Sequence, residues 1–343
     1  MQNYSLGMIG NVFNKSPTSR LGFTPILAIS VLALALIPFG ISDYWVFQLT
    51  IIIAHSIALL GLNLLTGFNG QISLGHGAFY AAGAYTTAVL MDKFGIPYWM
   101  TIPISGALCY GLGLAIGYPA LRLEGLYLAL VTLAMGVCVP QILKYKHFES
   151  WTGGVQGILL IKPDAPLGLP LMPDHWLYLF TLVVAVGMFI AARNLLNGHT
   201  GKALVAIRDN SIAASAMGID VARYKTTTFG ISALYTGVAG SLASLAIQFV
   251  APDSFQALSI GFLVGIVVGG LASISGAIYG AIFIQFVPHI AENISKAAPS
   301  AIFGVLLIAF VYALPYGIAG SIKKFLLLRT MRAASASNRA KVP

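Results

Sequence analysis

Charged residues are scarce in this sequence of 343 residues, where Asp, Glu, Lys and Arg together make up 8%. About a quarter of the residues are charged in a typical soluble domain, so a soluble globular protein is excluded. Hydrophobic residues reach 58%, and they form continuous apolar runs rather than the alternating pattern of a transmembrane β-barrel. We therefore predict an all-α, polytopic membrane helical bundle with about ten transmembrane spans, some of them short or broken, and with both termini in the cytoplasm.

Cysteine is nearly absent as well. Cys109 and Cys138 are the only two, and both fall inside predicted spans. This excludes a disulfide framework, and the lack of a Cys/His cluster at ligand spacing gives no support to a metal site. We expect both cysteines to be packing residues.

The sequence also lacks a nucleotide-binding motif. Residues 10–16, GNVFNKS, have no glycine before the lysine, and residues 198–203, GHTGKA, have the wrong spacing for a phosphate-binding loop. If ATP drives this protein, a partner subunit binds it. We therefore expect a transport subunit rather than an enzyme, with no cofactor of its own.

No Asp or Glu lies in the interior of a predicted span. Carriers driven by protons or sodium usually place ionisable groups near the middle of the bilayer. The only titratable candidates there are His55 and His76, and a single buried histidine more often serves as a hydrogen-bonding residue than as a proton relay. An ion-coupled carrier and a channel-like facilitator thus stay as alternatives to a permease driven by a cytoplasmic motor.

The formal net charge of +9 is explained by the position of the basic residues. Most lie in predicted cytoplasmic segments, as the positive-inside rule requires, so no nucleic-acid partner is implied and the surroundings are membrane lipid. We divide the chain into a cytoplasmic tail (1–20), a transmembrane permease domain (21–320) that contains a cytoplasmic coupling loop (194–225), and a basic cytoplasmic tail (321–343).

The stretch from Thr66 to Gly77 reads TGFNGQISLGHG and contains four glycines in twelve residues, which opposes a regular helix. Polar, irregular backbone survives at membrane depth only when it is buried in protein or lines a wet cavity. We interpret the stretch as a broken helix that borders a translocation pathway, and a short cytoplasmic loop is the alternative. The pathway residues we predict are Asn63, Asn69, Gln71, Ser73 and His76.

Two further segments carry functional predictions. In the coupling loop, Asp209 and Asn210 can cap the helix IAASAM by accepting hydrogen bonds from its first turn, and Gly218 can end it in a left-handed conformation. We expect this short helix to present Ala213, Ala214 and Ala216 to another protein, and a helix lying on the membrane surface is the alternative. In the external segment 144–175, a docking face or gate around Thr152, Gly153 and Gly154 is as plausible as a plain connector.

Glycines also mark the second half of the chain. Gly265, Gly269, Gly270 and Gly276 predict close helix approach. The tetrapeptide at residues 276–279, GAIY, echoes GAFY at residues 77–80, as a parallel internal repeat or by convergence of small-residue breaks.

Several motifs together resemble the LivM-type permeases of branched-chain amino acid ABC importers. They are GLNLLTGFNGQISLGHGAFYAAGAY (61–85), LRLEGLYLALVTLAMG (121–136), TGGVQGI (152–158), AIRDNSIAASAMGIDVARYK (206–225), PDSF (252–255) and GGLASISGAIYGA (269–281). The likeness covers most of residues 45–320.

This resemblance implies a heterodimer with a LivH-type permease subunit, two cytoplasmic ATPase subunits and a periplasmic substrate-binding protein in a bacterial inner membrane. It also implies that residues 208–218, including Arg208, dock in the ATPase. The expected solutes are leucine, isoleucine and valine. Urea, short amides and other amino acids stay as alternatives, because the family also transports them.

Overall fold

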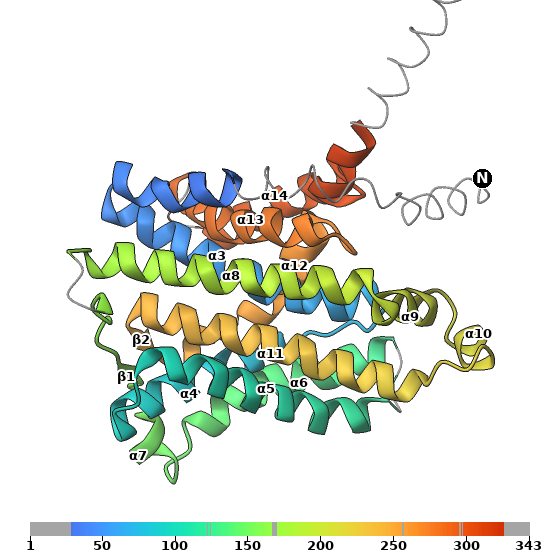
Figure 1. Cartoon of the computed structure of the whole chain (residues 1–343), viewed down its shortest axis with the longest axis horizontal. Helices are drawn as coiled ribbons and strands as arrows, with labels where there is room; N and C mark the ends of the chain where they lie inside the picture. The colour runs from blue at the N-terminus through green and yellow to red at the C-terminus, as the bar shows by residue number, and fades with distance from the viewer. Residues whose placement is uncertain are drawn as a thin grey trace, which may run out of the picture.

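The computed structural model describes residues 29–121, 123, 125–166, 170–255, 257–294, 296 and 298–325. The predicted N-terminal tail, the start of the first predicted span, Arg122, Glu124 and the basic tail beyond Phe325 lie outside these ranges. The described part is almost entirely helical (Figure 1). In chain order its elements are η2 (Ile37–Gly40), α3 (Asp43–Asn63), η3 (Leu64–Phe68), α4 (His76–Phe94), α5 (Tyr98–Ala120), α6 (Leu126–Leu143), α7 (Glu149–Thr152), β1 (Ile158–Leu159), α8 (Pro173–Asn197), α9 (His199–Asp209), α10 (Ser211–Ala216), α11 (Val221–Ile247), β2 (Phe249–Val250), η5 (Pro252–Phe255), α12 (Leu258–Gly269), α13 (Ile274–Ile294) and α14 (Pro299–Ala313).

The long helices run along a common direction and form a bundle (Figure 1). Helices α9 and α10 lie at one end, and β1, β2 and α7 lie at the other. Within the described residues, eight helical segments are long and apolar enough to cross a membrane. These segments coincide with spans predicted from the sequence, so the polytopic helical bundle is confirmed. Helix α4 and the shorter apolar helix at residues 29–40 are outside this set of eight.

Helix α11 lies at the centre of the bundle and packs against α3, α4 and α5. Small residues make this approach possible. A Cβ atom added at Gly61 of α3 would collide with Tyr235, and one added at Gly83 of α4 would collide with the backbone of Gly237. Because apolar lipid gives helices no hydrophobic reason to associate, such close packing of backbones is what holds membrane helices together.

The glycine seam predicted in the second half of the chain is confirmed. A Cβ atom at Gly269 would collide with the backbone of Gly276, and one at Gly265 would collide with Ile284.

The prediction for the cysteines is half right. Cys109 is buried and packs against Gly237, whereas Cys138 is exposed, because it lies on the outward face of α6.

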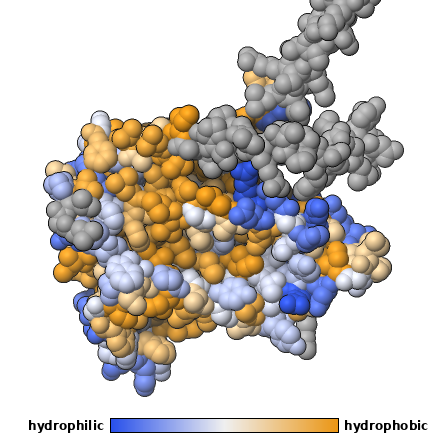
Figure 2. Space-filling model, viewed as in Figure 1, coloured by the Kyte–Doolittle hydropathy of each residue, from blue (hydrophilic) through white to orange (hydrophobic). Residues whose placement is uncertain are grey.

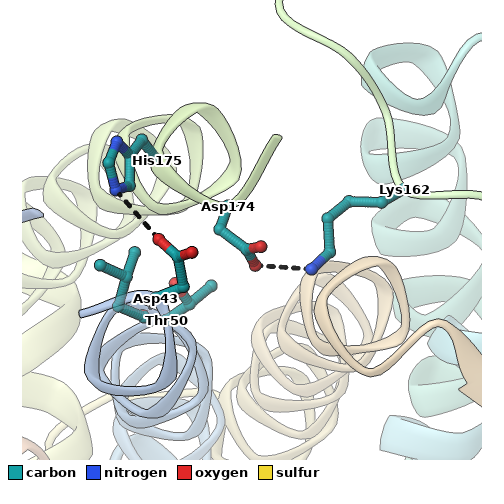
Figure 3. A network of polar contacts seen from close by, with 6 residues as sticks. Asp43, Thr50, Lys162, Asp174 and His175 are labelled. Carbon is teal, nitrogen blue, oxygen red and sulfur yellow. Dashed lines mark hydrogen bonds and ion pairs between the residues drawn. The ribbon is translucent and has the colours of Figure 1, made fainter. Parts of the chain in front are cut away.

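Ion pairs and a two-stranded sheet join neighbouring segments at the β1–β2 end of the bundle. Strands β1 and β2 are antiparallel, with Ile158 opposite Val250. Figure 3 shows Lys162 paired with Asp174, and His175 beside Asp43, with 3.5 Å between Nε2 and Oδ1. These contacts join the start of α8 to the start of α3 and to the loop before α8. On the face shown in Figure 2, apolar side chains cover the middle, and hydrophilic ones gather toward the two ends of the bundle.

Candidate translocation site and coupling segment

The predicted break is present. Helix α3 runs into the π-helical turn η3, residues 69–75 are not helical, and α4 begins at His76. Gly70 has a φ of +76°, a value that glycine adopts without strain. A Cβ atom at Gly67 would collide with Asn63 and with the backbone of Ala272, so this position also has no room for a side chain. The π turn contacts α9, which places the break toward the α9–α10 end of the bundle.

The polar residues of the break face into the protein and bond to one another. Asn69, Gln71 and Ser73 are buried, whereas Gly70 is exposed and Ile72 is 42% exposed. The side-chain amide of Asn69 donates to Oε1 of Gln71 at 3.0 Å, and Thr66 donates to the Gln71 carbonyl at 3.0 Å. These bonds hold the irregular backbone in shape, and the surface that the break presents outward is Gly70 and Ile72.

His76 lies in a chain of hydrogen bonds that joins three helices. Ser232 of α11 donates to the carbonyl of Gly61 in α3 at 2.6 Å, so its oxygen is left to accept from Nε2 of His76, also at 2.6 Å. Nδ1 of His76 then accepts from Ser73 at 3.0 Å. A neutral histidine with its proton on Nε2 satisfies every bond in this chain. This arrangement supports the hydrogen-bonding role expected for His76.

Asn63 connects this break to a second one. Its Nδ2 donates to the carbonyl of Ser273 at 2.8 Å, and its Oδ1 accepts from the backbone N–H of Ala272 at 2.9 Å. Residues 270–273 separate α12 from α13, with φ values of +122° at Gly270 and +55° at Ala272. The two breaks therefore share one fully buried side chain. Sequence reasoning missed this contact, because the partners lie about 210 positions apart.

The short helix predicted in the loop 194–225 is α10. Asn210 caps it as predicted, with its Oδ1 accepting from the N–H of Ala213 at 3.0 Å, and Gly218 has the expected left-handed φ of +83°. Asp209 does not cap the helix. Its carboxylate binds the guanidinium of Arg208 at 2.9 Å instead.

The outward face of α10 differs from the predicted one. Ala214 is buried on the side that contacts α9 and α11, so the expectation that it is exposed is wrong. Ala213 and Ala216 are exposed as expected. Ile212 and Met217, which are 82% and 83% exposed, were not singled out from the sequence. Two large apolar side chains in the open are typical of a contact with another protein or with the membrane surface, so both interpretations of this helix stay open.

Arg208 reaches from α9 to the break. Its Nη1 donates to the carbonyl of Gly67 at 3.1 Å, while Nε and Nη2 hold Asp209. Its aliphatic part lies against Gly70, where a Cβ atom would come within 2.9 Å of Cγ. Because the planar guanidinium binds two partners at once, its orientation is fixed. Arg208 therefore touches the break directly and stands two residues before Asn210, which caps α10.

The external residues have clear local roles. Thr152 is buried and donates to the carbonyls of Leu143 and Phe148, at 2.7 Å and 2.9 Å, and so joins the end of α6 to α7. Gly153 and Gly154 have φ values of +71° and +59° and turn the chain there. Beside them is a cavity of about 290 Å³. Its lining includes Asp92, Lys93, Glu149, Trp151 and Gly157.

Comparison with known proteins decides the family. The family described as "Branched-chain amino acid transport system / permease component" matches residues 44–313. The LivM permease protein of the high-affinity branched-chain amino acid transport system of Escherichia coli K12 is 33% identical over 317 residues, which is 85% of this chain and 74% of that protein. The chain belongs to this family of permeases.

Other relatives agree. LivM of Salmonella typhimurium is 31% identical over 332 residues, covering 90% of this chain and 77% of the relative. A probable LivH permease protein of Methanocaldococcus jannaschii is 26% identical over 300 residues, covering 79% of this chain and 90% of the relative. No solved structure matches the chain significantly.

Membership in the family settles the broad class. The chain is a multi-pass membrane protein and the transmembrane component of an ABC transport system, and it is not a catalytic subunit. A permease of this kind works with ATPase subunits and a substrate-binding protein, and the family requires no cofactor. Within the described residues, no group of three or more His, Cys, Asp or Glu side chains is arranged to hold a metal ion.

Proposed function

We propose that this permease is the LivM-type half of an importer for leucine, isoleucine and valine in a bacterial inner membrane. Its partners are a LivH-type permease, two cytoplasmic ATPases and a periplasmic binding protein. The observation that supports this most directly is the contact of Arg208 with Gly67, because it links an exposed cytoplasmic helix to an irregular segment inside the bundle. A subunit that is moved by a separate motor needs such a link.

The topology we propose has ten spans. To the eight segments that are long and apolar enough we add α4 and the first predicted span, of which the structure describes residues 29–40. Helix α4 is 19 residues long and contacts α11, α5 and α12, so it crosses the bundle although its alanines, glycines and threonines make it less apolar. Ten spans place both termini on the side of α9 and α10, which is the cytoplasm.

At the α9–α10 end of the bundle, the solute path passes the outward surface of the break. Gly70 and Ile72 border it, and Asn63, Asn69, Gln71, Ser73 and His76 support it from behind with uncharged hydrogen bonds. An uncharged border suits a zwitterion that must pass without being trapped.

Force enters at α10. Ile212 and Met217, with Ala213 and Ala216 between them, dock against an ATPase, and Gly218 sets the angle at which the chain leaves the helix. Displacement of α10 is transmitted through Asn210, Asp209 and Arg208 to the break. The external loop at Thr152, Gly153 and Gly154 faces the binding protein at the opposite end.

Reconstitution tests the proposal. The chain is placed in proteoliposomes with its permease partner, both ATPases and the binding protein, and uptake of radiolabelled leucine is measured with and without ATP. We expect the leucine concentration inside the proteoliposomes to rise above that outside. This uptake should need ATP and should be insensitive to a proton ionophore. Uptake that survives removal of the ATPases and collapses with the ionophore would replace the proposal with an ion-coupled carrier. Competition by urea but not by valine would reassign the solute.

A further inference from the structure

Several buried side-chain atoms in the described part of the chain have no hydrogen-bond partner, among them Oδ1 of Asn69 and Oγ1 of Thr181, and two of these atoms belong to neighbouring rings deep in the bundle. His55 of α3 is 7% exposed and Tyr80 of α4 is 2% exposed. Nδ1 of His55 and the hydroxyl of Tyr80 are both buried and unpaired within the described part of the chain. Buried polar groups in native proteins are nearly always paired, so each exception needs a reason.

The other buried tyrosines show that a partner is the norm here. Tyr85 donates to the carbonyl of Val250, Tyr178 donates to that of Leu34, and Tyr235 donates to that of Met188. Tyr80 is the exception among the buried tyrosines of the described residues. Replacing it by phenylalanine would remove an unfavourable buried hydroxyl, so stability alone does not account for a tyrosine at this position.

The two unpaired groups belong to one aromatic cluster. The ring centroids of His55 and Tyr80 are 5.9 Å apart, and the ring of Phe262 lies 5.7 Å from the first and 5.3 Å from the second. Phe255 adds a fourth ring, 6.1 Å from Tyr80. These residues come from α3, α4, α12 and the turn before α12, so the cluster lies where both interrupted helix pairs meet.

The depth of the cluster also fits a transport site. His55 is near the middle of the 26-residue helical run Asp43–Phe68, which is long enough to cross a membrane. Transporters commonly place their solute sites near the bilayer midplane, among discontinuous helices.

We propose that His55 and Tyr80 form a transient binding point for the amino acid as it passes through the permease. The Tyr80 hydroxyl donates to the solute carboxylate, and the free imidazole nitrogen of His55 accepts from its ammonium group. Phe255 and Phe262 contact the aliphatic side chain. Neither polar group carries a charge, so the solute is not held tightly. The inference rests on the proposed import of amino acids and adds to it the residues that touch the solute.

In this structure the aromatic rings fill the cluster, so the site is closed. Its opening requires α12 to move relative to α3 and α4. Helix α12 ends at the break that Asn63 holds through Ala272 and Ser273, so a displacement at the first break reaches Phe262 through α12.

The test compares two tyrosines in the complete transporter. Tyr80→Phe removes an unpaired hydroxyl, whereas Tyr235→Phe removes a buried hydroxyl that bonds the carbonyl of Met188 at 2.9 Å. The readouts are leucine imported per ATP hydrolysed, which is independent of the amount of folded protein, and the melting temperature in detergent.

We expect Tyr80→Phe to lower leucine per ATP by about tenfold, the effect of losing one hydrogen bond to a charged solute group. Its melting temperature should equal or exceed that of the wild type. Tyr235→Phe should show the reverse, with a lower melting temperature and an unchanged ratio. His55→Leu is a second variant and should also lower the ratio.

If Tyr80→Phe imports as much leucine per ATP as the wild type, the proposed site is wrong. A lower melting temperature with an unchanged ratio would show that the hydroxyl has a purely structural role. Failure of the wild-type complex to import leucine with ATP rejects the proposed function instead. The two failures are therefore distinguishable.

Discussion

The bundle contains two interrupted helix pairs that differ in an informative way. In the first, α3 and α4 are joined through residues 64–75, and in the second, α12 and α13 are joined through residues 270–273. The echo between residues 77–80 and 276–279 falls at the start of the helix that follows each break. Gly77 and Gly276 both lie where a Cβ atom would collide, with Ser259 and with the carbonyl of Gly270.

The first break is long and polar and is contacted by Arg208 of α9. The second is short and shares two hydrogen bonds with Asn63 of the first pair. Tyr80 after the first break is fully buried, and its counterpart Tyr279 is only half-buried. The difference teaches that similar local sequence builds two units with different roles. In the proposed mechanism the first receives the displacement, and the second follows it through the side chain of Asn63.

The largest effect is expected where the two units touch, at Gly67. Gly67→Ala places a Cβ atom against Asn63 and the backbone of Ala272, and backbone cannot move away as a flexible side chain can. We expect a loss of about 3 kcal/mol in the free energy of unfolding, seen as a lower melting temperature and a lower yield in the membrane. Gly187→Ala on α8 is the matched control, because nothing lies within 4 Å of its Cβ position. Equal behaviour of the two variants would contradict the close contact between the breaks.

Asn63→Leu should weaken the contact between the two helix pairs, with a smaller loss of stability than Gly67→Ala. It leaves the N–H of Ala272 and the carbonyl of Ser273 without their partner, which destabilises the protein by about 2 kcal/mol. Thermal unfolding measures this loss. Hydrogen exchange at residues 270–276 should become faster, while exchange at residues 64–68 changes less. Unchanged exchange at the second break would show that Asn63 does not hold it.

Most of the fold could be predicted from the sequence, because continuous apolar runs and glycine breaks are local signals. Asn210 and Gly218 were assigned correctly for the same reason. The contact of Asn63 with Ser273 could not be foreseen, since it depends on how α3 packs against α12 and α13. Ala214 shows the same limit, because the buried side of α10 is decided by α9 and α11. The functional roles assigned to the pathway and coupling residues stay predictions.

A third prediction concerns Arg208, through which α9 contacts the first break. Arg208→Met removes the bond to Gly67 and the partner of Asp209 while keeping much of the aliphatic contact with Gly70. We expect leucine imported per ATP to fall about tenfold, with ATP hydrolysis retained, because loss of a charge-assisted bond is of this size. Lys202→Met, an exposed change on the same helix α9, is the control. A similar ratio in the two variants would exclude Arg208 as the link.

The smallest effect is expected at the outer end of the second unit. Lys144 pairs with Asp253 just before α12, but the aspartate is 63% exposed, and exposed ion pairs contribute about 1 kcal/mol or less. Lys144→Met should therefore change the melting temperature slightly and leave leucine per ATP unchanged. A drop in that ratio as large as that of Arg208→Met would show that the outer end also transmits force.

In the proposed mechanism α10 moves the break, and labelling at Ile72 tests this movement directly. A cysteine replaces Ile72 in a Cys138→Ala background, since Cys138 is exposed and Cys109 is buried. Its reaction rate with a water-soluble thiol reagent is measured in the complete transporter, without nucleotide and after incubation with ATP and vanadate, which traps ADP in the ATPases. The account predicts a rate that differs between the two states, and a difference that Arg208→Met abolishes. Equal rates in both states would contradict it.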